Sequence, residues 1–448
     1  MLILLGFMVL LGCLVIGVRQ GGLGLAAVSG MGLIIFIFGM GLTPGKPPVD
    51  VMLTIMAVVA CSGFLQASKG LDVMLKYAEI FLRSNPKYVT ILAPVTTWFL
   101  TILCGTGHVV YAMFPVIYDI AIKQNIRPER PMAAASVASQ MGVCASPASV
   151  AVVSAVAILA ATSHPFGVIQ ILSISIPASL CGVIAAGLWS LQRGRDLEKD
   201  PDFLAMIADP EKKAFVYGEM EGEKMANSQL PATAYKAAVI FLLGIVAIAV
   251  FGSFPQLLPH FADAKGVLKP LSMTPTIQLL MLAIATVIML VCKVKASAVA
   301  AGSVFQSGMV AIVSVYGVAW MADTYFTAYL PVMKKTLGEI VLVYPWLYAV
   351  VLFLTSKLIN SQAAAVTVIV PMALSVGIDP LLVVAFMPAC YGYFILPTYP
   401  SDIACIGFDR SGTTRIGKFI INHSFIMPGL IGVSTGCAAG YLLVHLFY

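Results

Sequence analysis

Long apolar stretches, separated by short polar segments, alternate along the whole chain. They cover residues 1–18, 22–41, 50–66, 131–163 and 167–190 in the first half, and 233–252, 274–292, 299–322, 380–408 and 425–446 in the second. Each approaches or exceeds the roughly 20 apolar residues that cross the hydrocarbon core of a bilayer as a helix. The pattern predicts an all-α polytopic membrane protein with five transmembrane helices in each half.

Two further apolar segments, residues 87–123 and 344–377, are each interrupted near the middle. The interruption reads Cys104-Gly-Thr-Gly-His108 in the first segment and Asn360-Ser-Gln-Ala363 in the second. Neither segment is long enough to cross the membrane twice as two full helices. We therefore expect each of them to form a re-entrant hairpin.

The two halves repeat the same order of elements. Sliding one half over the other lays Tyr88 on Tyr344 and Pro115 on Pro371, although identity between the halves is otherwise low. An odd number of crossings in each half requires the two repeats to be inverted, an arrangement common in secondary transporters.

This repeat divides the chain into a first repeat (1–190), a cytoplasmic linker (191–232) and a second repeat (233–448). The parts expected within the repeats are scaffold helices (1–66 and 233–322), amphipathic arms (70–84 and 327–342), hairpins (87–123 and 344–377) and further helices (131–190 and 380–446). This plan of hairpins and broken helices is similar to that of ion-transporter-superfamily carriers, and the similarity implies an elevator-type architecture.

Basic residues set the expected orientation. Most of the 26 lysine and arginine residues fall on segments that share one side of the membrane, and that side is cytoplasmic if the first helix starts outside. The positive-inside rule favours this orientation, with both termini periplasmic and the two hairpins entering from opposite faces. The exceptions are Lys46, Lys265, Lys269, Lys334 and Lys335 outside, and Lys357 within the second hairpin.

Composition excludes several other classes of protein. Only 10% of the 448 residues are charged, and the nine cysteines and five histidines show no metal-ligand or disulfide spacing. No nucleophile and base stand at a readable spacing, so we expect no enzyme, no cofactor and no nucleic-acid partner. A proton or a sodium ion remains open as a coupling ion, and membrane lipid is an expected partner.

Four breaks in apolar helices carry the expected chemistry: the two hairpin tips, residues 145–149 and residues 396–402. Irregular backbone at membrane depth is tolerated where it lines a cavity, and broken helix ends present dipoles to charged solutes. The alternative is that Gly and Pro merely kink the helices. The candidate substrate-binding residues are Thr106, Gly107, His108, Ser146, Ser149, Lys357, Asn360, Ser361, Gln362, Thr398, Ser401 and Asp402.

Three of these side chains can carry charge. A lysine at position 357 is costly in a bilayer, so it either binds a substrate carboxylate, snorkels to the outer surface or pairs with Asp402. Asp402 can hold a proton, a sodium ion or Lys357, and His108 either donates to a carboxylate or is structural. The remaining hydroxyl and amide groups can bind carboxylate oxygens or simply bond the preceding helical turn.

Several motifs resemble the anaerobic C4-dicarboxylate uptake (Dcu) family over essentially the whole chain. They are Thr101-Ile-Leu-Cys-Gly-Thr-Gly-His108, Arg127-Pro-Glu-Arg-Pro131, Asn360-Ser-Gln-Ala-Ala364, Ile395-Leu-Pro-Thr-Tyr-Pro-Ser-Asp402 and Phe408-Asp-Arg-Ser-Gly-Thr-Thr414. Within that family, Gly45-Lys-Pro-Pro-Val-Asp50 together with His108, Lys357 and Asp402 looks like the fumarate–succinate exchanger branch rather than the aspartate-handling branch.

The resemblance implies a transporter of fumarate, succinate, malate and aspartate in the bacterial cell inner membrane. It implies fumarate:succinate antiport in anaerobic metabolism, with some cation-coupled uptake, and an aspartate/fumarate uptake carrier is the alternative within the family. More distant similarity to ion-transporter-superfamily carriers implies a homodimer that works by elevator-type alternating access. An anion channel remains the main alternative outside the carriers, ahead of a membrane subunit of an energy-converting enzyme.

Overall fold

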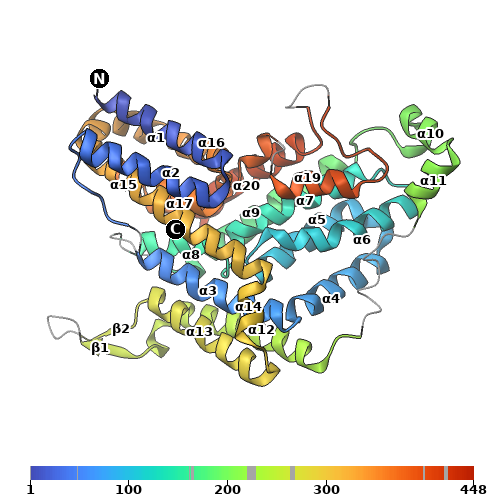
Figure 1. Cartoon of the computed structure of the whole chain (residues 1–448), viewed down its shortest axis with the longest axis horizontal. Coiled ribbons are helices and arrows are strands. Elements are labelled where there is room, and N and C mark those ends of the chain that lie inside the picture. Colours follow the sequence, from blue (N-terminus) through green and yellow to red (C-terminus); the bar gives the residue numbers. More distant parts are fainter. Residues whose placement is uncertain are drawn as a thin grey trace.

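The computed structural model describes residues 2–47, 49–160, 162, 166–218, 229–262, 268–396, 399–417 and 422–448, and almost all of its regular structure is helical (Figure 1). Within these described ranges, seven helical segments are long and apolar enough to cross a membrane: Val49–Ala67, Pro86–Cys104, Glu129–Leu159, Val168–Ser190, Met273–Cys292, Val304–Tyr329 and Ile426–Phe447. Helical backbone satisfies its own N–H and C=O groups, as a bilayer requires. The predicted helical, membrane-embedded fold is confirmed at this level.

The first helical group consists of segments that come early in each half of the chain. Its members are α1 (Leu2–Arg19), α2 (Gly21–Ile34), α3 (Val49–Ala67), α12 (Ala232–Ser253), α13 (Met273–Cys292), α14 (Ala296–Ala301) and α15 (Ser303–Val343). Within the group, α2 packs against α1 and α15, and α3 packs against α13 and α15. Helices from the two halves of the chain therefore share one core.

Helix α15 differs from the expectation of a separate helix at 299–322 and arm at 327–342. The structure has one continuous helix from Ser303 to Val343. No glycine or proline stands between Ala322 and Thr327, and Pro331 lies inside the helix instead of ending it. In the first half α3 and the arm helix α4 (Gly70–Ser84) are separate, because Lys69 adopts a left-handed conformation between them.

The second helical group contains both hairpins and both broken segments. Its members are α5 (Val89–Cys104), α6 (Val110–Lys123), α7 (Glu129–Met141), α8 (Val150–Leu159), α9 (Val168–Ser190), α16 (Trp346–Ile359), α17 (Gln362–Val376), α18 (Pro380–Ala385), α19 (Pro400–Phe408) and α20 (Ile426–Phe447). Helix α9 packs along α20, and α7 packs against α5. Each hairpin folds back on itself, with α5 against α6 and α16 against α17.

Two pieces of structure lie outside the long apolar stretches. The linker contains the short helices α10 (Pro201–Ile207) and α11 (Pro210–Tyr217), which are capped by the side chains of Asp200 and Asp209. Strands β1 (His260–Ala262) and β2 (Leu268–Pro270) form an exposed antiparallel pair between α12 and α13. The apolar pattern did not predict these strands.

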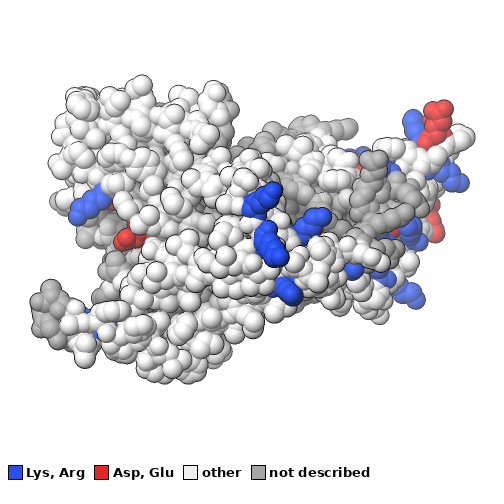
Figure 2. All heavy atoms as spheres, turned by 60° about the horizontal axis from the view of Figure 1, so that its bottom comes forward, with Lys and Arg blue, Asp and Glu red and all other residues white. Residues whose placement is uncertain are grey.

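Buried charges gather where α7 begins. Arg127 Nε donates to Glu129 Oε2 at 2.8 Å, and Arg193 Nε donates to Glu129 Oε1 at 3.1 Å. Arg127 also pairs with Asp200, so that hydrogen bonding outweighs burial and the pKa of Asp200 is lowered. We call Arg127, Glu129, Arg193 and Asp200 the charged cluster. Over most of the face in Figure 2, the visible surface carries neither sign of charge.

The charged cluster also joins two segments that are far apart in the sequence. The backbone N–H of Glu129 donates to Thr413 Oγ1 at 3.0 Å, and Ser424 Oγ donates to Glu129 Oε1 at 2.7 Å. Asp409 holds the loop after α19 by accepting from Ser411 and Thr413. The motifs at 127–131 and 408–414 therefore form one joint, which ties α7 to the segment before α20.

Candidate functional site

The first hairpin turns through one left-handed and one extended residue. Helix α5 ends at Cys104, Gly105 has φ +76°, and Thr106 is extended with φ −141°. The Thr106 hydroxyl accepts from the backbone N–H of His108 at 3.3 Å, which caps the short 3₁₀ turn that leads into α6. The positive, N-terminal end of the second helix of the hairpin therefore lies at its tip.

The second hairpin has the same backbone plan with different residues. Asn360 takes the left-handed position with φ +53°, and Ser361 is extended with φ −151°. The Ser361 hydroxyl accepts from the backbone N–H of Ala364 at 3.3 Å and caps α17. Glycine and asparagine are the residues that enter the left-handed region most readily, and serine and threonine cap helices well. Both tips therefore begin a helix in the same way.

The first broken segment lies where it was predicted, between α7 and α8. A 3₁₀ turn at Gly142–Ala145 ends α7, and the Ser149 hydroxyl caps α8 by accepting from Val152 N at 3.2 Å. Ser146 Oγ donates to the Ile102 carbonyl oxygen at 2.6 Å, which fastens the break to the first hairpin. Both serines are buried and make these internal bonds.

The second broken segment is longer than the predicted break at residues 396–402 and begins earlier. Helix α18 ends at Ala385, two 3₁₀ turns follow at Met387–Cys390 and Tyr393–Ile395, and α19 begins at Pro400, so that Asp402 lies within a helical turn. Pro388 and Gly392 fall in this stretch, where they disfavour a continuous α-helix. Thr398 lies outside the described residues.

A cavity of about 180 Å³, partly open to solvent, lies between the first helical group and the two hairpin tips. Six predicted residues line it: Thr106, Gly107, His108, Asn360, Ser361 and Gln362. Its other wall comes from α3 and α15, through Val58, Val59, Ser62, Val304 and Gly308. We call this space the central cavity. Of the residues that line it, none carries a lysine, arginine, aspartate or glutamate side chain within the described ranges.

Three side chains connect the breaks beside the central cavity. Tyr393 Oη donates to Gln140 Oε1 at 2.6 Å, and Gln362 Nε2 donates to the Gln140 carbonyl oxygen at 2.7 Å. Gln362 Nε2 also lies 3.2 Å from Tyr393 Oη. This network joins the end of α7, the second tip and the second broken segment, and Gln140 Nε2 is a buried donor without a partner in the described part of the chain.

The first tip meets the same network at Gly107. A side chain there would place its Cβ 2.4 Å from Gln140 Nε2 and 2.8 Å from Gln140 Oε1, closer than such atoms approach. Glycine is therefore needed for the tip to lie against the amide. Together with the network, this contact brings all four breaks to one place.

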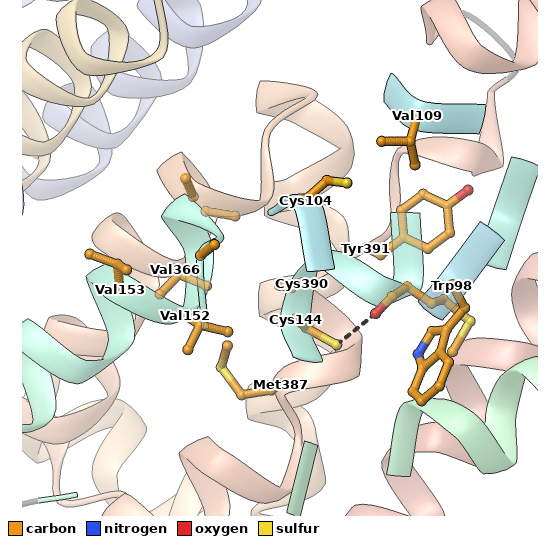
Figure 3. Close-up of a cluster of buried hydrophobic side chains, with 14 of the residues drawn as sticks. Trp98, Cys104, Val109, Cys144, Val152, Val153, Val366, Met387, Cys390 and Tyr391 are labelled. Carbon is orange, nitrogen blue, oxygen red and sulfur yellow. Dashed lines mark hydrogen bonds between the residues drawn. The ribbon is translucent and has the colours of Figure 1, made fainter. Parts of the chain in front are cut away.

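Behind the cavity, one hydrophobic cluster supports the breaks (Figure 3). It contains Trp98, Cys104 and Val109 from the first hairpin, Cys144, Val152 and Val153 from the first break and α8, Val366 from α17, and Met387, Cys390 and Tyr391 from the second break. Close packing of this kind holds irregular backbone in a single arrangement.

Lys357 and Asp402 are not among the side chains that line the central cavity. The Lys357 ammonium lies 3.2 Å from Asn360 Oδ1, 3.3 Å from the Tyr393 carbonyl oxygen and 3.2 Å from the Leu396 carbonyl oxygen. It therefore fastens the second tip to the second broken segment. Its role towards a substrate carboxylate stays a prediction.

Asp402 lies buried near the start of α19. Its Oδ1 accepts from Ser136 Oγ at 2.8 Å, while Oδ2 has no hydrogen-bond partner among the residues that the structure describes. Ser401 Oγ is likewise buried and unpartnered within those residues. Asp402 Oδ2 is therefore available to bind a proton or a cation, two of the alternatives that the sequence left open.

Several lining residues were not predicted from the sequence, and among them Gln140, Tyr393 and Tyr399 bring an amide or a phenol group to the cavity. Gln140 lies within an α-helix and has no helix breaker of its own, Tyr393 precedes the predicted break at residues 396–402, and Tyr399 lies inside that break but was not chosen as a candidate. An amide side chain little more than one turn before the predicted break at residues 145–149 is the signal that could have identified Gln140.

Comparison with known proteins decides the family. A model of the anaerobic C4-dicarboxylate membrane transporters matches residues 2–448. The chain is 52% identical over 450 residues to the anaerobic C4-dicarboxylate transporter DcuB of Escherichia coli O157:H7, covering 100% of this chain and 99% of that one. This chain belongs to the anaerobic C4-dicarboxylate transporter family.

Membership in the family makes the protein a C4-dicarboxylate transporter and not an enzyme. Identity to the C4-dicarboxylate transporter DcuA is lower: 37% over 430 residues for Escherichia coli K12, with 96% of each chain covered, and 36% over 440 residues for Wolinella succinogenes, with 97% and 98% covered. The resemblance seen in the sequence motifs is confirmed, including its greater likeness to DcuB.

A solved structure shares the fold. The structure of Neisseria gonorrhoeae MtrF, whose title places it in a class of antimetabolite efflux pumps, aligns with a TM-score of 0.52 over 93% of this chain and 84% of that chain. Sequence identity is 14%, so the likeness concerns the fold alone.

Proposed function

We propose that this C4-dicarboxylate transporter binds fumarate, succinate, malate and aspartate in the central cavity and exchanges external fumarate for internal succinate. The observation that carries the proposal is the joining of all four helix breaks through Gln140, Gln362 and Tyr393, with Gly107 against the same amide. Broken helices that meet at one point form the substrate sites of many secondary transporters.

Neutral groups in the cavity suit a dianion that must be both bound and released. The Ser361 and Thr106 hydroxyl oxygens already accept from backbone N–H groups, so their protons are free to point towards a carboxylate oxygen. Gln140 Nε2 is a further donor, and the helix starts at α6 and α17 add positive dipole ends. Together these groups replace hydration without placing a permanent charge in the cavity.

The movement that we propose is an elevator. The hairpins and residues 131–190 and 380–446 would carry the substrate past scaffold helices 1–66 and 233–322, with α4 and the end of α15 as arms. The matched backbone of the two tips supports inverted repeats, and the valine-lined wall of α3 and α15 offers a smooth surface for sliding. A homodimer in the bacterial inner membrane, with both termini periplasmic, completes the proposal.

Lys357 has a specific part in this mechanism. Its ammonium binds the carbonyl groups of the second broken segment next to the tip, so it adds positive potential at the cavity while it remains hydrogen-bonded. A bound dianion would offset this charge and lower the cost of moving the loaded site, whereas the empty site would move poorly. Asp402 is the group that we propose for a coupling proton or sodium ion.

Reconstituted vesicles test the exchange. Vesicles loaded with succinate should take up labelled fumarate much faster than empty vesicles, with sodium and pH gradients varied separately. Strong uptake into empty vesicles driven by sodium would overturn exchange in favour of cation-coupled uptake. Single-channel currents would overturn the carrier in favour of an anion channel.

Substitution of a tip residue tests the location of the site. Ser361→Ala removes the cap of α17 and one substrate donor, so fumarate KM should rise about tenfold. The matched control is Ser173→Ala, which removes an exposed hydroxyl on α9 that bonds only its own helix. Equal KM values in both variants would place the site elsewhere.

A further inference from the structure

A second cavity lies between α15 of the first helical group and α8 and α17 of the second. It has a volume of about 130 Å³, and its polar lining comes from Lys46, Asp323, Thr327, Thr367 and Ser375. We call it the outer cavity, because the expected orientation places Lys46 on the periplasmic side. The transport mechanism proposed above does not use this cavity.

The outer cavity and the central cavity are lined by the same three helices. On α17, Ala363 lines the central cavity and Thr367 lines the outer one, and Thr367 Oγ1 bonds the Ala363 carbonyl oxygen at 2.6 Å across a single helical turn. On α8 the corresponding residues are Ala151 and Ile158. A helical turn advances about 5.4 Å, so the two cavities lie one after the other along these helices. We call the boundary between the two helical groups, where both cavities lie, the seam.

Lys46 is held at this seam by a loop that is fixed on α15. Gly45 N donates to Thr324 Oγ1 at 3.0 Å, Lys46 N donates to Asp323 Oδ2 at 2.7 Å, and Trp320 Nε1 donates to the Gly45 carbonyl oxygen at 2.8 Å. A Cβ at position 45 would lie 2.4 Å from Asp323 Oδ2. Glycine at position 45 is therefore required for the loop to lie this close to the helix.

The charged groups of the outer cavity favour an anionic ligand. Lys46 is the basic side chain of the outer cavity, and its ammonium has no ion pair in the described part of the chain. Asp323 Oδ2 is occupied by the backbone N–H of Lys46, and Asp323 Oδ1 lies 3.5 Å from Thr327 Oγ1. The carboxylate is thus used to hold the loop, and the ammonium stays available at the mouth of the seam.

We propose that the outer cavity is an entry subsite, in which Lys46 binds one carboxylate of a dicarboxylate arriving from outside before it moves along α17 to the central cavity. This inference rests on the proposed function, which supplies the central site and the orientation. A single exposed ammonium binds weakly, and weak binding lets the substrate pass on.

Exchange kinetics in vesicles of defined orientation test the subsite. Lys46→Gln should raise KM for external fumarate about three- to tenfold while kcat and KM for internal succinate stay unchanged, and the difference from wild type should shrink at high ionic strength. Lys46→Arg should keep the wild-type KM. Gly45→Ala, which displaces the loop, should reproduce the external KM change, and Lys269→Gln on the exposed β-strand pair is the control expected to change nothing.

The outcomes separate the two proposals. Wild-type vesicles without trans-stimulated exchange would overturn the proposed function itself. Normal wild-type exchange together with an unchanged external KM in both Lys46→Gln and Gly45→Ala would overturn only the entry subsite. Equal KM increases on both sides of the membrane would also overturn it, because they indicate a general change in the fold.

Discussion

Helix α7 has a charged end and a neutral end, and the two ends bind their neighbours in opposite ways. At its start, the carboxylate of Glu129 is buried and takes hydrogen bonds from Arg127, Arg193 and Ser424. Near its other end, Gln140 binds the second tip and the second break through a neutral amide. The two ends are about 20 Å apart, given a rise of about 1.5 Å per residue.

The two ends of α7 are suited to different tasks: the charged end to a structural joint, and the neutral end to reversible binding. Fully buried charges must keep their partners, since an uncompensated charge costs several kcal/mol, so the charged cluster is suited to a permanent joint. Amides and hydroxyls cost less when a ligand leaves, so they can bind a dianion and release it again. In the proposed mechanism, the charged cluster therefore holds segments together, and the neutral donors at the other end of α7 bind the substrate and release it.

Removal of the buried carboxylate should have the largest effect. Glu129→Gln leaves Arg193 and Arg127 without their shared carboxylate in a buried joint, which should lower the free energy of unfolding by about 3 kcal/mol or more. The thermal unfolding midpoint of the purified protein in detergent measures this, along with the amount recovered from membranes.

Asp209→Asn is the control for the charged end. Its carboxylate faces Lys212 at 3.9 Å on the exposed linker, where an ion pair adds little. The two midpoints should therefore differ clearly. A Glu129→Gln protein as stable as Asp209→Asn would show that the charged cluster is not a structural joint.

Crowding at the neutral end should cost transport rather than stability. In Gly107→Ala the new methyl group would meet the amide of Gln140, so the first tip must shift away from the network. We expect exchange to fall at least tenfold while the unfolding midpoint changes little, because misplacement of a binding group by about 1 Å is enough for such a loss. Gly30→Ala is the matched control, since a Cβ there meets nothing within 4 Å. If Gly107→Ala exchanged at the wild-type rate, the first hairpin tip would not be part of the substrate site.

At the neutral end of α7, the sequence predicted the parts of the candidate site that contain helix-breaking residues. Glycine and asparagine located both tips, and the capping hydroxyls of Thr106 and Ser361 were named because they follow such residues. Gln140 and Tyr393 were not named, since their role depends on which helices meet, and that is decided by packing between segments far apart in the chain. Local propensity carries no record of such contacts.

The same limit explains the misplaced boundaries. The break before Asp402 was marked at its prolines, but the α-helix already ends at Ala385 and gives way to a 3₁₀ turn at Met387–Cys390, with Pro388 inside the turn. Ser146 was predicted to bind substrate because it stands in a break; its hydroxyl donates to the Ile102 carbonyl oxygen, and its role towards a substrate stays a prediction. The helix continues through Pro331, which local preference alone would place at a helix boundary.

Loss of one hydroxyl from the network should have a moderate effect. Tyr393→Phe removes the donor to Gln140 Oε1 and the acceptor of Gln362 Nε2, so we expect fumarate KM to rise about fivefold, equivalent to about 1 kcal/mol. Tyr88→Phe, an exposed tyrosine, is the control. Gln140→Ala should add little to Tyr393→Phe, because residues that bind each other are not additive. Fully additive effects would contradict a shared network.

The smallest effect is expected at the exposed edge of the charged end. Arg130 Nη2 lies 2.9 Å from Asp196 Oδ1, and this hydrogen bond and charge lower the pKa of Asp196 below its ordinary value of 3.8. A lowered pKa means that the ionised carboxylate stabilises the fold above that ordinary value, and that the contribution is lost as the pH falls through the lowered pKa. Asp196→Asn should therefore lower the unfolding midpoint slightly at pH 7, less at high salt, and not at all at pH values below the lowered pKa. A difference that persists unchanged in strong acid would assign the stabilisation to packing of the side chain rather than to its charge.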